Sequence, residues 1–148
     1  RFQDSKFTNY APGGEMPIIS VRYVREDRNH DLWVAGFNSI VKMSGTKFLP
    51  VVDSKQLEGS FTQAIAFDRN GNTWIGGSTG ILRRSADGSV RHFGTAEGLP
   101  DAFVRAVLED RDGNIWVGTN AGVTRPQFGF RHSDFWAQGI NLGVMQDF

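Results

Sequence analysis

The 148-residue sequence contains no cysteine, which excludes thiol catalysis, thiolate metal sites and disulfide bonds. It also has no excess of one charge, because sixteen basic residues balance sixteen acidic ones. A balanced chain lacks the general attraction to nucleic acid or to an anionic membrane surface, so we expect neither partner. No apolar run approaches the length of a membrane span, and we predict no direct membrane contact in this segment.

Sustained helical spacing of apolar residues is missing as well. Short runs rich in β-branched and aromatic residues occur instead, separated by Gly, Asn, Asp and Pro. This pattern predicts an all-β chain and argues against a helical solenoid.

Three tryptophans are spaced at steps of 41 and 42 residues, Trp33, Trp74 and Trp116, and each follows a turn that opens with Asp-Arg. A repeat of about 40 residues with several short strands is typical of a β-propeller blade. We therefore predict a β-propeller fragment built from four-stranded antiparallel blades of 41 to 42 residues.

The expected strands follow the same order in each repeat. They cover residues 21–26, 32–35, 40–43 and 47–49 in the first repeat, 62–67, 73–76, 80–83 and 89–93 in the second, and 104–109, 115–118, 123–125 and, more weakly, 128–132 in the third. The Asp-Gly dipeptide in the third repeat is a hairpin signal.

The phase of the repeat predicts three full blades and a partial blade at each end. Residues 1–17 would supply the outer strand of a preceding blade, residues 18–58, 59–100 and 101–138 the three blades, and residues 139–148 the first strand of a following one. Blades bury their faces only against neighbours, so we expect self-association through the exposed blade faces.

The run from Glu109 to Thr119, preceded by Glu97-Gly98-Leu99-Pro100 and followed by Gly122-Val123 and Arg125, resembles the two-component regulator propeller repeat. Residues 97–125 carry the pattern best, residues 66–83 are a close copy, and residues 24–42 are degenerate, with His30-Asp31 in place of Gly-Asn.

The resemblance implies a non-enzymatic sensor in the periplasm, or otherwise outside the cytoplasm, as part of an inner-membrane protein. It implies a small-molecule ligand such as an oligosaccharide, and no cofactor in this segment. Proteins of this family carry a transmembrane helix and a cytoplasmic histidine kinase or diguanylate cyclase after the propeller.

Two other functions stay open at this point. One is a protein-interaction scaffold that binds another chain through its blade edges or faces. The other is an enzyme similar to the streptogramin lyases, which would need a histidine base beside a metal or an acid. We interpret His30, His92 and His132 as surface or structural residues, because their scattered positions match neither a metal site nor a triad.

The remaining motifs have structural interpretations. The turns at Asp110 and Asp68 lack the distal glutamate of a calcium loop, since the twelfth positions are Ala121 and Thr79. We therefore predict plain hairpins in which the aspartates accept hydrogen bonds from turn amides. We predict no metal site there. The glycines of residues 76–80 lack the Lys-Ser/Thr of a phosphate loop. We expect the three repeated tryptophans in the core and Trp136, outside the repeat register, to be the most exposed.

Ligand contacts are expected where equivalent loops of the blades gather at one end of the channel. The turns after each Trp strand and the links into each inner strand meet there. Inner-strand donors at equivalent positions could project into the channel, although they could equally line a wet channel without a ligand. The predicted ligand-binding residues are Arg22, Phe37, Asn38, Gln63, Ser78, Thr79, Leu99, Asp101, Arg105 and Asn120.

Overall fold

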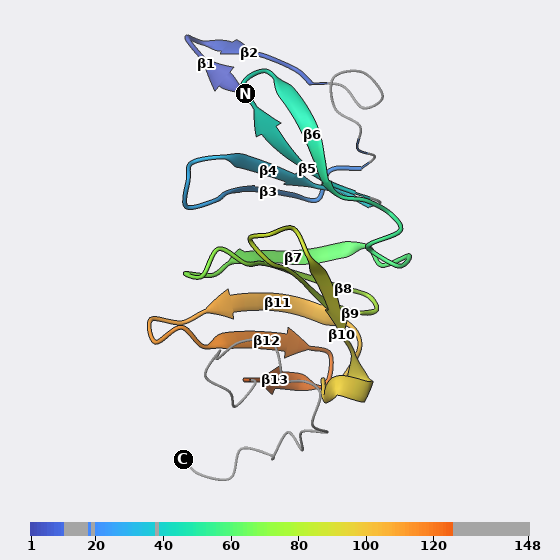
Figure 1. Ribbon diagram of the computed structural model, residues 1–148. Coiled ribbons are helices and arrows are strands. Elements are labelled where there is room, and N and C mark those ends of the chain that lie inside the picture. Colours follow the sequence, from blue (N-terminus) through green and yellow to red (C-terminus); the bar gives the residue numbers. More distant parts are fainter. Residues whose placement is uncertain (11–17, 19, 38, 126–148) are drawn as a thin grey trace. The chain divides into compact units, whose positions relative to one another are not determined.

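The fold is seen in a computed structural model, which describes residues 1–10, 18, 20–37 and 39–125 (Figure 1). Its regular elements are β-strands with one short 3-10 helix, which confirms the all-β expectation. The chain divides into two compact units, residues 1–59 and residues 60–148. No helix among the described residues is long and apolar enough to cross a membrane.

The first unit contains one four-stranded antiparallel sheet, called sheet 1, with strands in sequential order. The strands are β3 (Tyr23–Glu26), β4 (Leu32–Ala35), β5 (Ile40–Ser44) and β6 (Lys47–Val52). Before the sheet, β1 (Phe2–Gln3) and β2 (Lys6–Phe7) form a small hairpin. A core of Ile18, Val34, Val41 and Phe48 lies on sheet 1, and Tyr10 packs edge-on against Phe48.

The second unit contains two antiparallel sheets. Sheet 2 has the order β10-β9-β8-β7, and sheet 3 has the order β11-β12-β13. Their strands are β7 (Thr62–Phe67), β8 (Thr73–Gly77), β9 (Gly80–Arg84), β10 (Val90–Phe93), β11 (Val104–Glu109), β12 (Ile115–Thr119) and β13 (Gly122–Thr124). The 3-10 helix η1 (Thr95–Glu97) precedes the link into β11.

Sheets 2 and 3 pack face to face, and β11 lies against β7 and β8. The buried layer between them consists of Trp74, Ile81, Phe93, Leu99, Val104, Ile115 and Val117. Gly76 permits this approach, because a Cβ placed on it would lie 2.4 Å from Cγ1 of Val104. A small residue at this position is therefore needed to bring the two sheets together.

The other face of sheet 3 is not covered by described residues. Leu108 and Val123 on this face have 63% and 67% of their surface exposed, and Trp116 beside them is half-buried. Trp33 and Trp74 are buried, as the sequence predicted, whereas Trp116, also expected in the core, is only half-buried because no described residues cover this face of sheet 3. Trp136 and the fourth strand expected at residues 128–132 lie outside the described residues.

The strands expected within the described residues form, most of them with shifted ends. The inner strands at residues 62–67 and 104–109 have the predicted bounds. Strand β6 continues past Leu49 through Pro50 to Val52, because β6 is the edge strand of sheet 1 and an edge strand tolerates a missing donor. Helix η1 was not predicted.

Candidate functional site

The start of each inner strand in the second unit contains a β-bulge. The pairing of β7 with β8 shifts between Thr62 and Ala64, and that of β11 with β12 shifts between Val104 and Ala106. The extra residues are Gln63 and Arg105, two of the predicted ligand-binding residues. A bulge re-aims a side chain away from the regular alternation of a strand, and bulges are frequent beside functional sites.

Arg105 is held on two sides. Its Nε donates to Oδ1 of Asn120 at 2.9 Å, and its guanidinium lies 4.2 Å from the centroid of the Phe103 ring. The backbone N–H of Asn120 donates to the carbonyl of Phe103 at 3.2 Å. Both Arg105 and Asn120 are exposed. The link into β11 and the turn after β12 therefore meet at this end of sheet 3. Between them, the exposed Arg105 guanidinium lies between an aromatic ring and a side-chain amide.

Two aromatic residues that the sequence reasoning missed complete this arrangement. Phe61 and Phe103 each precede an inner strand, and their rings meet edge to face with centroids 5.6 Å apart. The signal was present in the sequence, because Phe61-Thr62-Gln63-Ala64 and Phe103-Val104-Arg105-Ala106 are equivalent in the repeat. We call Phe61, Phe103, Arg105 and Asn120 the rim cluster.

Other predicted residues surround the rim cluster in structural roles. Ser78 Oγ lies 3.4 Å from Ser60 Oγ, which also accepts from the backbone N–H of Thr79. Asp101 accepts from the backbone N–H of Phe103 at 2.7 Å and so positions that ring. Leu99 is buried in the layer between sheets 2 and 3, where it packs rather than facing solvent.

Three of the predicted ligand-binding residues, Arg22, Phe37 and Asn38, belong to the first unit. The backbone N–H of Arg22 donates to the carbonyl of Ala35, and the Arg22 side chain is exposed. Phe37 is exposed after β4. Asn38 lies outside the described residues.

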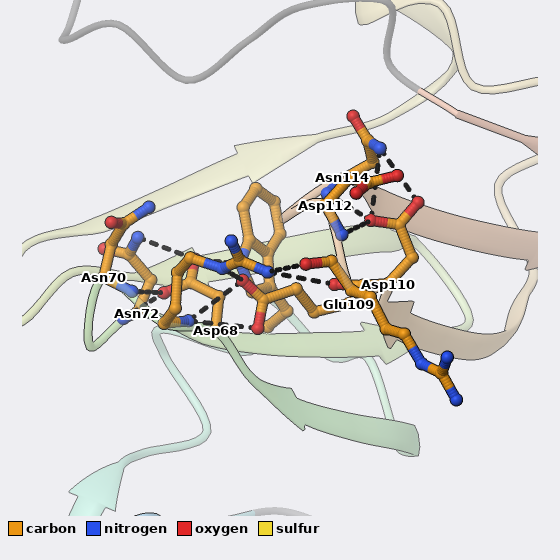
Figure 2. A network of polar contacts seen from close by, with 10 residues as sticks. Asp68, Asn70, Asn72, Glu109, Asp110, Asp112 and Asn114 are labelled. Carbon is orange, nitrogen blue, oxygen red and sulfur yellow. Dashed lines mark hydrogen bonds and ion pairs between the residues drawn. The ribbon is translucent and has the colours of Figure 1, made fainter.

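The opposite ends of the inner strands carry the Asp-Arg turns. Asp68, 2% exposed, accepts from the backbone N–H groups of Asn70 and Asn72 and from the indole N–H of Trp74 at 2.8 Å (Figure 2). Asp27 and Asp110 bind their own turn amides and tryptophans in the same way. The prediction that the aspartates accept hydrogen bonds from turn amides is confirmed. The hydrogen bond from the tryptophan indole was not predicted.

These bonds change the acidity of two aspartates. The indole N–H of Trp116, followed by the Asn114 side chain, holds the pKa of Asp110 well below its usual value. Burial raises the pKa of Asp27, but the bonds from Trp33 and from the turn amides outweigh it, so this pKa is also lowered. The carboxylates are therefore committed to the turns as acceptors. No group of three or more metal-ligating side chains occurs in the described part of the chain.

The family model described as two component regulator propeller matches residues 98–121, which include Arg105 and Asn120. No curated protein matches the sequence.

Several solved structures share the fold. The extracellular domain described as that of the hybrid two component system BT4673 of B. thetaiotaomicron is 16% identical over 82% of this chain and 17% of its own length, with a TM-score of 0.67. The corresponding domain of BT3049 from the same organism is 21% identical over 70% of this chain and 15% of its own, with a TM-score of 0.61.

An inactive variant of virginiamycin B lyase from Staphylococcus aureus is also similar, with 16% identity over 72% of this chain and 37% of its own and a TM-score of 0.60. At these identities the likenesses show the fold. The chain is thus a β-propeller fragment whose residues 98–121 match the two component regulator propeller model, and its fold is similar to that of the extracellular domains of hybrid two-component systems.

Proposed function

We propose that this chain is part of an extracytoplasmic sensor propeller of a bacterial two-component or cyclic-dinucleotide signalling protein, and that its rim cluster binds a small molecule such as an oligosaccharide. The repeat match and the similarity to extracellular domains support the sensor role. Such domains lie outside the cytoplasm, which supports a periplasmic location.

One observation carries the ligand site. A β-bulge places Arg105 beside Phe103, and Asn120 fixes its guanidinium by a bond to Nε. The remaining guanidinium N–H groups are donors for hydroxyl or carboxylate oxygens. The Phe61 and Phe103 rings offer apolar surface for the face of a sugar. A few fixed polar groups beside aromatic surface are typical of small-molecule sites.

The proposal is tested by calorimetric titration of the full chain with a panel of neutral and acidic oligosaccharides. For the sugars that bind, we expect Arg105→Ala and Asn120→Ala to weaken affinity about tenfold, because each removes a hydrogen bond to or from a charged group. Arg111→Ala is the control, since Arg111 lies in the turn at the other end of β11 and is exposed. Unchanged affinity in all three variants, or no binding by any sugar, would contradict the proposal.

A further inference from the structure

We propose that Arg83 and Arg91, on the two outer strands of sheet 2, form a second binding site that takes the oxyanion group of a ligand, a carboxylate or a sulfate. The two arginines are directly opposite each other in the β9–β10 ladder, so their side chains leave the same face of the sheet. This site lies on strands that contribute nothing to the rim cluster and does not depend on the function proposed for that cluster.

Aromatic rings hold both guanidiniums in place. The Arg83 guanidinium lies 5.9 Å from the centroid of Trp74, and that of Arg91 lies 5.1 Å from the centroid of Phe93. The two rings are buried and stack on each other with centroids 6.3 Å apart. Stacking on a rigid pair of rings limits the motion of both cations, which lowers the entropic cost of binding an anion between them.

The pair has no counter-ion within the described residues. Neither arginine forms an ion pair there, and Nε of Arg83 is buried without a hydrogen-bond partner. Like charges directly opposite each other on a sheet are unfavourable, and a buried donor without an acceptor is unfavourable too. An oxyanion bound to both guanidiniums would remove the penalty of the two opposed charges.

In sheet 1, the cation at the position equivalent to Arg83 is neutralised by carboxylates. Lys42 occupies the place of Arg83, opposite the repeat tryptophan, and its Nζ lies 2.5 Å from Asp31 and 3.5 Å from Asp27. The strand neighbour opposite Lys42 is the apolar Leu49. The first repeat therefore combines one cation with two carboxylates.

Sheet 2 differs at both neighbouring positions. Asn72 replaces Asp31, and its side-chain amide is already engaged as a donor to Asp68. Arg91 replaces Leu49 and adds a second cation. Compared with the first repeat, the second therefore has one carboxylate fewer and one guanidinium more at these positions. Two guanidiniums offer the paired N–H donors that carboxylate and sulfate oxygens accept.

The test follows the arginine Nε–Hε signals of the full chain by NMR during titration with sodium glucuronate, sodium sulfate and, as an uncharged control, glucose. We expect saturable shifts of the Arg83 signal with glucuronate, with sulfate or with both, and none with glucose. Arg91→Gln should weaken binding about tenfold, because it removes one of two charged donors. Shifts with neither anion, or equal shifts with glucose, would overturn the proposal.

Two further variants separate the site from general charge effects. Arg84→Gln removes an equal charge from the neighbouring position of β9, whose side chain points to the other face, and should leave binding unchanged. Asn72→Asp restores the carboxylate that sheet 1 has, and should abolish anion binding by supplying an internal partner for Arg83. If Arg84→Gln weakens binding as much as Arg91→Gln, or if Asn72→Asp binds as well as the native chain, the assignment is wrong.

Discussion

Arg69 binds Glu109 across the two sheets of the second unit. Its Nε donates to Oε1 of Glu109 at 3.0 Å, and its backbone N–H lies 3.1 Å from both carboxylate oxygens. Nη2 of Arg69 reaches further, to the carbonyls of Asp110 and Arg111. Glu109 accordingly lies between the two Asp-Arg turns (Figure 2). One repeat's turn arginine thus clamps the inner strand and turn of the next repeat.

We expect Arg69→Gln to lower the free energy of unfolding by about 1–2 kcal/mol, because it removes the charged partner of a carboxylate that is only 7% exposed. The loss should be smaller than for a fully buried pair, because the Arg69 side chain is partly exposed and screened by solvent. Urea unfolding of the full chain, with hydrogen exchange of β7 and β11 as the local measure, checks it.

Arg111→Gln provides the matched control for this clamp. Arg111 has the same place in the next turn, but it is exposed and no described residue accepts a bond from its side chain. The control should change the unfolding free energy by less than about 0.5 kcal/mol. Equal effects of the two substitutions would show that the clamp contributes nothing beyond general surface charge.

Gly76→Ala should destabilise the packing of sheet 2 on sheet 3. The added methyl would lie 2.4 Å from Cγ1 of Val104, which is fully buried, and 3.3 Å from Cγ2 of Val107. We expect a loss of about 1–3 kcal/mol, typical of overpacking a core. Thermal unfolding followed by tryptophan fluorescence measures it.

Gly118→Ala tests whether the effect belongs to the sheet interface. Gly118 holds the same repeat position on sheet 3, where the nearest contact of an added methyl is Cβ of Ala106 at an ordinary 3.4 Å. Neither glycine requires a left-handed backbone. The Gly118 variant should unfold near the native temperature, and a comparable loss in both variants would assign the effect to strand propensity instead.

The repeat and most strands were predictable because local sequence sets them. The Asp-Arg turn, the tryptophan three residues after its glycine, and the β-rich run before it form a contiguous signal, and the inner strands at residues 62–67 and 104–109 were predicted with their observed bounds. The turn role of Asp68 and Asp110 was predictable for the same reason, since the amides that they bind are two and four residues away.

The features that could not be predicted from the sequence depend on contacts between residues far apart in the chain. The clamp of Arg69 on Glu109 joins residues forty positions apart, and nothing local distinguishes Arg69 from Arg111. The bulges at Gln63 and Arg105 arise from strand pairing, which a strand's own sequence does not contain. Arg105 and Asn120 of the rim cluster were predicted because equivalent loops of the repeats gather at one end of the blades. The contact between Arg105 and the Phe103 ring was not predicted, because it depends on where Phe103 lies in space.

Lowering the pH should destabilise the Asp110 turn. The hydrogen bond from Trp116, followed by that from Asn114, lowers the pKa of Asp110 below the ordinary 3.8. A carboxyl whose folded pKa is lowered adds stability that is complete above its unfolded pKa and is lost as the pH falls towards the folded pKa. The contribution of Asp110 is therefore present at neutral pH and declines below about pH 4.

Trp116→Phe tests the cause, because it removes the indole donor and keeps an aromatic ring on the strand. The pKa of Asp110, followed by the ¹³C shift of its carboxyl carbon, should rise towards 3.8, since the first of its stabilising bonds is gone. Asp27 serves as the internal control, because its own bond comes from Trp33 and its titration should stay unchanged. An unshifted Asp110 titration in this variant would mean that the turn amides and Asn114 alone account for the lowered pKa.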